Sequence, residues 1–507
     1  MRLPSPSFPA SLPSAPADAG ADAVADAGAD AVADSDAGTG VTVPRRSRTA
    51  PALVAGAVLL LYAAHSLREH RRFGTTGYDL GIFGQAVRAY AEFRLPASEI
   101  RTATAPPGFT GDAYPLLADH FHPVLALLGP LYRLFPHVEL LLLAQSALIA
   151  LSVYVVARAA QRHLPRPGAG VAIGLAYGLC WGLQQLAAFD FHEVAFAVPL
   201  LALACRAHLD GRWVAAACWA GSLVLVKEDL GATAAVFGLL LIRHHRRAGI
   251  ALCAFATVST VLVVGVALPA WAPDGRYGYL DQPHEYGLLD GWPVKSLTLL
   301  ALLAVTAGTL LRSPLGLLLL PTLAWRLTSP NPAYWGPELH YSAVLVPIAF
   351  AALVDVLRRG VRLPHVVPLL VSLLLLPAQP LRDLVVPGFW RDGPRQVAAR
   401  AALARVPDGA RVAASNGLAP HLVDRARVHL VADGVLDLPT PVEWIVVDTR
   451  DAFPPGAVDG VLRRAEGRGW RRVHAADGIV VLRAQRAYVP SPTRQYTYSF
   501  TVAPLIV

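Results

Sequence analysis

The recurrence of apolar segments between Pro51 and Gln379 constrains this chain more than any other feature. Short gaps in which arginine is frequent separate the segments, and the mean hydropathy of the chain is +0.44. Only 16% of the 507 residues are charged, whereas soluble domains carry about a quarter. The sequence therefore predicts a mostly α-helical protein that crosses the bilayer many times. It excludes a soluble enzyme, a fibrous protein and a disulfide-stapled secreted domain.

About eleven of these segments are candidate membrane spans. A spanning helix needs about 20 apolar residues, and several segments are shorter, so we expect some of them to be half-helices or re-entrant pairs. The candidates are residues 50–67, 138–159, 168–188, 193–209, 213–226, 230–242, 250–272, 296–312, 314–327, 341–357 and 363–379.

The placement of arginine predicts the topology. Arg45, Arg46 and Arg48 precede the first span, and arginines dominate alternate gaps after it, as is typical of cytoplasmic loops. We therefore expect a cytoplasmic N-terminus and a long first outer loop over residues 68–137. Four arginines disagree with this arrangement, but the other loops agree with it: Arg68, Arg71, Arg72 and Arg326.

Four regions follow from composition. Residues 1–48 form an acidic segment rich in Ala and Asp that cannot bury an apolar face, so we expect a disordered cytoplasmic tail. Residues 49–380 hold the spans. Residues 381–486 alternate short β-type and helix-type runs, which predicts a small α/β domain, and an odd number of spans places it outside the cell. Residues 487–507 receive no assignment.

The α/β domain carries no nucleotide-binding signature, since neither G-x-G-x-x-G nor a P-loop occurs in it. Ser415 and Asn416 follow the first expected strand; a helix cap is favoured over a ligand-binding loop, because both residue types prefer cap positions. The expected strands are 411–414, 428–431, 444–447 and 479–482, and the expected helices are 396–404 and 458–466.

The net charge of +8 does not indicate nucleic-acid binding, because the arginines sit at the ends of apolar segments and not on a basic face with interleaved aromatics. The four cysteines lie inside apolar segments without metal-ligand spacing, so we expect no disulfide partner. They are Cys180, Cys205, Cys218 and Cys253.

Polar residues gather in four clusters that the expected topology places on the outer side of the membrane. A fifth, weaker candidate is His340 at the start of the tenth span. The clusters are Tyr78, Asp79 and Gln85; Asp119, His120 and His122; Asp190, His192 and Glu193; and Lys227, Glu228 and Asp229.

Lys227 is the most informative of these residues. Only two of the 44 Lys and Arg residues are lysines, Lys227 and Lys295. A lysine offers a compact charge that suits a phosphate, and three charges between two apolar runs are costly unless they pair or serve a site. The alternative is an interfacial salt-bridge turn. For Asp79 the alternative is a helix cap, because an apolar-periodic stretch follows it directly.

The histidines admit two interpretations. With Asp119 and the 190–193 turn, His120 and His122 could bind a divalent cation through nitrogen and oxygen ligands. Alternatively, they bond to backbone or lipid headgroups at the interface. No cofactor is required by the sequence.

A lipid-borne phosphate would lie at the depth of these clusters. A carboxylate can accept a proton from a hydroxyl group, and a lysine can hold a phosphate. These parts suit the transfer of a sugar from a polyprenyl-phosphate donor to an extracytoplasmic acceptor. The alternatives are a non-catalytic component that binds or exports an envelope ligand, and a secondary transporter, which would place ionisable residues near the bilayer midplane on broken helices.

An ordered set of motifs resembles the bacterial membrane proteins grouped as domain of unknown function 2079. The motifs are Tyr78–Gln85, His120–Pro123, Phe191–Glu193 and Val226–Leu230, and the resemblance covers about residues 50–485. It implies a location in the bacterial plasma membrane.

The layout of that family is similar to the GT-C glycosyltransferases, in which an acid in the first outer loop is the usual catalytic base. This likeness implies that Asp79 is the base, although the paired acids common in that loop are missing here. Independently of this likeness, we expect Lys227 to hold the donor phosphate, with His120, His122, His192 and Glu193 completing a polar cup, and we predict the remaining polar residues of the clusters as substrate-binding. The full set is Tyr78, Gln85, His120, His122, Asp190, His192, Glu193, Lys227, Glu228, Asp229 and His340.

Overall fold

The computed structural model describes residues 47–106, 108–279, 286–287 and 289–485. The Ala/Asp-rich tail and the segment 487–507 lie outside these residues, so the expectations for them stay predictions. The described part is mostly helical and belongs to one compact unit that begins at Arg46.

Every apolar segment expected to span the membrane coincides with helical structure, but the count of eleven spans is not confirmed. Four helices are long and apolar enough to cross a bilayer by themselves, at Thr49–Arg71, Glu139–His163, Arg246–Trp271 and His340–Arg358. A fifth candidate is a pair of helices bent by 42° at a short break, Ala169–Gly178 and Trp181–Ala188. The remaining apolar helices have 10–17 residues.

The central helix of the bundle is α14 (Leu345–Arg358), which is buried on all sides from Leu345 to Val356. It packs on α7 (Ala197–Leu209), and α7 packs on α4 (Glu139–His163). A helix that is apolar all round belongs in the interior. The outlying helix is α10 (Arg246–Leu262), where most of the exposed side chains are apolar, as suits contact with lipid.

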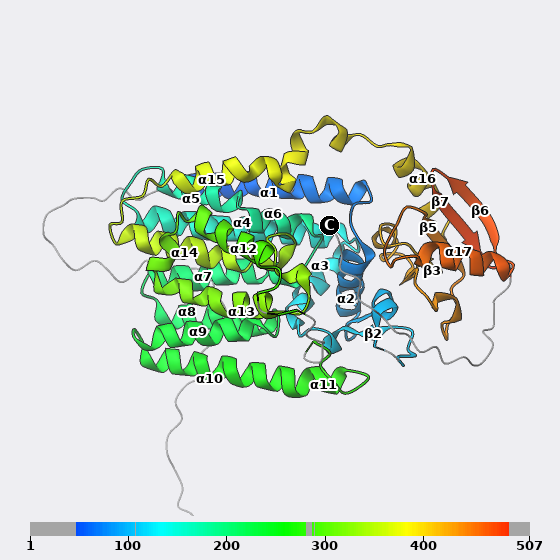
Figure 1. Ribbon diagram of the computed structural model, residues 1–507, viewed down its shortest axis with the longest axis horizontal. Coiled ribbons are helices and arrows are strands. Elements are labelled where there is room, and N and C mark those ends of the chain that lie inside the picture. The colour runs from blue at the N-terminus through cyan, green and yellow to red at the C-terminus, as the bar shows by residue number, and fades with distance from the viewer. Residues whose placement is uncertain (1–46, 107, 280–285, 288, 486–507) are drawn as a thin grey trace, which may run out of the picture. The chain divides into compact units, whose positions relative to one another are not determined.

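Figure 1 shows α8, α9 and α10 lying side by side. The approach of α9 and α10 depends on two glycines, because a Cβ on Gly238 would lie 2.7 Å from the backbone nitrogen of Cys253. A Cβ on Gly249 would lie 2.5 Å from the nitrogen of Ile242. Small residues allow such contacts between membrane helices. The other helices of this part are α1 (Thr49–Arg71), α2 (Ile82–Ala91), α3 (Gly129–Leu134), α5 (Ala169–Gly178), α6 (Trp181–Ala188), α8 (Trp213–Gly221), α9 (Leu230–Ile242), α11 (Leu268–Trp271), α12 (Trp292–Val305), α13 (Leu320–Thr328) and α15 (Val367–Leu375).

The C-terminal region forms a five-stranded sheet of order β4-β3-β5-β7-β6. The strands β4, β3 and β5 run parallel to one another, and β7 runs antiparallel to both of its neighbours, β5 and β6. All four expected strands are present; the fifth, β6, was missed because it is half exposed and carries three charged or titratable side chains among its six residues. The strands are β3 (Arg411–Ala414), β4 (Arg427–Leu430), β5 (Trp444–Asp448), β6 (Arg471–Ala476) and β7 (Ile479–Arg483), and a short pair is β1 (Ala97–Ser98) with β2 (Tyr114–Pro115).

One helix covers each face of this sheet. Alternate strand residues point to opposite faces, so Val446 packs on the side of α16 (Pro394–Leu403), whereas Val447 packs under α17 (Ala457–Gly467). Both expected helices are therefore present. After β3 the chain continues to β4 on one side, and after β5 it continues to the strands on the other side. In α/β sheets, ligands usually bind at the ends of two neighbouring parallel strands whose connections leave in opposite directions.

Candidate functional site

Asp79 lies in a single π-helical turn, Gly77–Gly81, directly before α2. Its carboxylate does not cap α2, so the capping interpretation is wrong. Instead its Oδ2 atom accepts a hydrogen bond of 3.1 Å from the Thr76 hydroxyl, and its Oδ1 atom lies 3.4 Å from Nε2 of His192. The Asp79 side chain is 21% exposed, which leaves it accessible to another molecule.

The loop after β3 holds this turn in place. The backbone nitrogen of Gly77 donates to the carbonyl of Asn416 over 2.7 Å, and that of Tyr78 donates to the Asn416 side chain over 2.9 Å. A Cβ on Gly77 would lie 2.6 Å from the Cβ of Ala419, so only glycine fits. Asn416 thus neither caps a helix nor faces an open ligand loop. It fixes the backbone that carries Asp79.

Asp190 is the second carboxylate near Asp79. It lies in a tight turn with a positive φ of 55°, accepts a hydrogen bond of 2.7 Å from the Thr76 nitrogen and lies 2.8 Å from the Thr76 hydroxyl oxygen. Burial, and then the charge of Asp79, raises the pKa of Asp190 to about 8. One of the two neighbouring carboxyl groups is therefore neutral at pH 7.

Gln145 on α4 fixes the shape of this turn. Its amide nitrogen donates to the carbonyls of Leu186 and Asp190, and its oxygen accepts from the nitrogen of His192 over 3.1 Å. Because Gln145 makes hydrogen bonds to the backbone of both Asp190 and His192, it fixes the turn from which the His192 side chain faces Asp79.

Aromatic rings surround the His192 imidazole. The ring of His340 stacks on it with centroids 3.6 Å apart, and Phe83 meets it edge-on at 5.3 Å. Arg326 is fully buried and donates to the carbonyls of Tyr334 and Gly336 and to the hydroxyl of Ser342, which lies in the same short turn as His340. Arg326 therefore has a structural role in holding this segment together.

Lys227 forms an ion pair with Glu193, with Nζ 2.9 Å from Oε1. The Glu193 side chain is 1% exposed and the Lys227 side chain 14%. Burial alone would lower the pKa of Lys227, but Glu193, Glu228 and Asp229 outweigh burial and hold that pKa above its usual range. Burial raises the pKa of Asp229 to about 6.

Glu228 organises the third part of the cluster. It accepts hydrogen bonds of 2.7 Å from Nδ1 of His120 and of 2.7 Å from the Tyr277 hydroxyl, and one of 3.0 Å from the nitrogen of Phe121. Burial and Lys227 would lower the pKa of His120, but Glu228 outweighs them and raises it. The Tyr279 hydroxyl lies 3.2 Å from the other His120 nitrogen.

One sequence-predicted residue, Gln85, lies away from the cluster, and the partners of Tyr78 and His122 are as follows. The Gln85 amide is occupied by the Val428 carbonyl, the Ser98 hydroxyl and the Ile100 nitrogen, so it joins β4 to the long loop and not to the cluster. The Tyr78 hydroxyl lies 3.0 Å from that of Thr104. His122 is buried without a hydrogen bond at Nδ1.

Asp119 also departs from the expected cation site. It pairs with Arg101 at 2.9 Å, and although burial opposes it, this guanidinium holds the pKa of Asp119 well below its usual range. Among the described residues, the carboxylates and imidazoles of the four clusters do not place three ligand atoms close enough to share one ion. A divalent cation bound there stays a prediction.

The Asp79 and Lys227 side chains belong to one cluster. Consecutive residues join them, since His192 faces Asp79 and Glu193 binds Lys227. The sequence analysis missed Thr76, Tyr277 and Tyr279 and gave Asn416 a different role, because the roles of these residues depend on partners far away in the chain. A signal existed only for Asn416, because it follows a strand at the ligand-binding edge of an α/β sheet.

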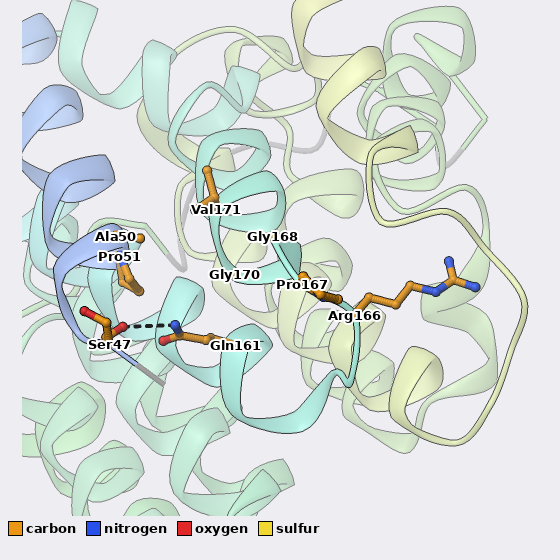
Figure 2. Close-up of a pocket in the computed structure, with 9 residues that line it drawn as sticks. All are labelled: Ser47, Ala50, Pro51, Gln161, Arg166, Pro167, Gly168, Gly170 and Val171. Carbon is orange, nitrogen blue, oxygen red and sulfur yellow. Dashed lines mark hydrogen bonds between the residues drawn. The ribbon is translucent and has the colours of Figure 1, made fainter. Parts of the chain in front are cut away.

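A cavity of about 310 Å³ lies elsewhere, between the start of α1 and the link from α4 to α5. Figure 2 shows the Gln161 side chain reaching across to the carbonyl of Ser47, a hydrogen bond of 3.0 Å. None of the sequence-predicted site residues lines this cavity. We place the candidate site at the polar cluster, because the cavity has no comparable set of titratable groups.

A family model for predicted membrane proteins, DUF2079, matches residues 69–481. This chain belongs to the DUF2079 family. The matched residues include Asp79, the 190–193 turn, Lys227 and most of the C-terminal sheet.

The fold of this family member is similar to a glycosyltransferase structure. The crystal structure of ArnT from Cupriavidus metallidurans in the apo state aligns with a TM-score of 0.50 and 15% sequence identity, covering 85% of this chain and 97% of ArnT. ArnT is a GT-C glycosyltransferase, and at this identity the likeness concerns the fold alone. A comparison with curated proteins finds no match.

Proposed function

We propose that this protein is a GT-C-type glycosyltransferase that moves a sugar from a polyprenyl-phosphate donor to an extracytoplasmic acceptor. One observation carries the proposal. The partly exposed Asp79 carboxylate contacts His192, and the partly exposed Lys227 ammonium pairs with the next residue, Glu193. The proposed topology puts the N-terminus in the cytoplasm and this cluster on the outer side of the plasma membrane.

Asp79 would act as the general base. During transfer, the bond between the sugar and the donor phosphate breaks, a bond from the sugar to the acceptor oxygen forms, and the acceptor proton moves to the Asp79 carboxylate. Thr76 and His192 orient this carboxylate, and Asn416 holds the backbone beneath it.

Lys227 would hold the donor phosphate, whose negative charge increases when the sugar leaves. Its ammonium carries three protons, and Glu193 is its one ion-pair partner within the described residues. Two protons are therefore available for phosphate oxygens. A lysine acts here as a point charge, so an arginine of different shape would place that charge wrongly.

A test compares envelope glycans from cells that carry wild type, Asp79→Asn or no protein. We expect the glycan change seen without the protein to appear with Asp79→Asn at unchanged protein abundance. Asp408→Asn is the matched control, since this carboxylate is 82% exposed in the α/β domain. Full glycan modification by Asp79→Asn would refute the base assignment.

A second candidate function is a secondary transporter or a component that exports an envelope ligand. The bent pair α5 and α6 and the break between α8 and α9 at Lys227 favour it, because transporters bind substrates where helices are broken. Proteoliposomes distinguish the two: substrate accumulation without sugar transfer supports transport, and transfer without accumulation supports the enzyme.

A further inference from the structure

A group of metal-ligand side chains lies away from the candidate site. It contains His137, which precedes α4, Glu139, the first residue of α4, and Asp424, in the loop before β4. One ligand atom from each residue lies within 4.8 Å of the others. Residues almost 300 positions apart in the sequence thus meet where the α/β domain contacts the helices.

The two carboxylates of this group have no strong cationic partner. Within the described chain, Asp424 pairs only with His137, at 3.7 Å, and Glu139 pairs only with a histidine, at 3.9 Å. The Tyr132 hydroxyl and the Val138 nitrogen donate to Asp424 over 2.6 and 3.2 Å. These neutral donors orient the Asp424 carboxylate but do not neutralise its charge. Carboxylates that bind metals are commonly held by hydrogen bonds of this kind.

A buried histidine, His70, contacts Glu139 from outside the group. Its side chain is 4% exposed, and its Nδ1 lies 2.8 Å from the Thr75 hydroxyl. Its Nε2 faces a Glu139 oxygen at 3.9 Å. Because His70 does not belong to the set of ligand atoms that lie within 4.8 Å of one another, it acts as an outer partner that orients the Glu139 carboxylate.

We propose that His137, Glu139 and Asp424 bind a zinc-type divalent ion, with water as the fourth ligand. Mixed imidazole and carboxylate ligands with a water in a set of four suit Zn²⁺, whereas Ca²⁺ takes six or more oxygens. Tetrahedral zinc ligands lie about 3.4 Å apart, and the exposed His137 side chain is free to close the remaining distance. The ion ties the α/β domain to the start of α4. The three protein ligands come from the segment around Val138 and the loop before β4. The proposal does not depend on the glycosyltransferase assignment.

The test measures zinc binding to the full chain, purified in detergent through a tag without histidine. The metal content after equilibration with Zn²⁺ and desalting is measured for wild type, His137→Ala and Asp424→Asn. We expect about one equivalent per chain in wild type and at least about tenfold weaker binding in both variants. Zn²⁺ should raise the unfolding temperature of wild type relative to EDTA, and not that of the variants.

Matched controls separate this site from other zinc ligands. His244→Ala removes an exposed imidazole on the turn after α9 and should keep the equivalent. His120→Ala and Glu228→Gln test the candidate active site. Loss of zinc from His137→Ala and Asp424→Asn, with or without a second ion lost from the candidate site, supports the proposal. Loss only from His120→Ala and Glu228→Gln overturns it, as does wild type that binds no Zn²⁺, in which case Glu139 and Asp424 form only a carboxyl pair.

Discussion

The Nε2 atom of His192 lies 3.4 Å from Asp79, while its Nδ1 atom lies 3.0 Å from the carbonyl oxygen of Phe189. A carbonyl can only accept, so Nδ1 carries a proton. The imidazole is therefore fixed by the Phe189 carbonyl on one side and points its other nitrogen at the carboxylate that we propose as the base.

Replacing Asp79 by Asn should reduce sugar transfer by at least about 100-fold, because the amide cannot take up a proton. Transfer from labelled polyprenyl-phosphate sugars by the purified protein measures this. His192→Gln should cause a smaller loss, since the amide can still donate to Asp79 but is not held by the Phe189 carbonyl as the imidazole is. A loss in His192→Gln as large as that in Asp79→Asn would contradict a positioning role for His192.

Replacing Lys227 by Met should destabilise the protein by about 3–5 kcal/mol, because it leaves the buried Glu193 carboxylate without its partner. The double variant Lys227→Met/Glu193→Gln should recover most of that loss and remain inactive. Thermal unfolding and sugar transfer, measured on the same preparations, separate the two effects. Lys227→Arg with full activity would show that a point charge is not needed.

Asp190→Asn should change how stability depends on pH. The pKa of the folded-state carboxyl is about 8, above the unfolded value of about 3.9, so the folded protein binds more protons between these values. Stability therefore falls as pH rises from about 4 to about 8, by about 1.4 kcal/mol per pH unit. The Asn variant should lose this slope, as unfolding temperatures at pH 5, 6, 7 and 8 would reveal. An equal slope in both proteins would contradict the raised pKa.

Gly77→Ala should reduce sugar transfer strongly, because its Cβ would lie 2.6 Å from that of Ala419 and displace the turn that carries Asp79. Asn416→Ala should be milder, since it removes one acceptor and leaves the Tyr78 nitrogen unpaired, at about 1–3 kcal/mol. Both variants should lower kcat more than they raise KM, because Lys227 is untouched. A change in KM alone would mean that this loop contacts the donor. Gly460→Ala, with open space around its Cβ position, is the control.

The sequence by itself determined the local elements. Apolar runs placed the long helices, including the central α14, and short β-type runs placed four of the five strands of the C-terminal sheet, because both patterns depend on neighbours only a few residues away. It also found the ionisable residues of the cluster, since charges between apolar runs are costly unless they have partners.

Only the tertiary structure decided which residues are partners. Asp119 pairs with Arg101, Glu228 with His120 and Glu193 with Lys227, and no local pattern distinguishes these pairings from the alternatives. Likewise, Asn416 reaches the Tyr78 backbone across 338 positions. The physical reason is that ion pairs and hydrogen bonds act over a few ångströms in space, whatever the separation along the chain, and the packing of the helices and the sheet sets that distance.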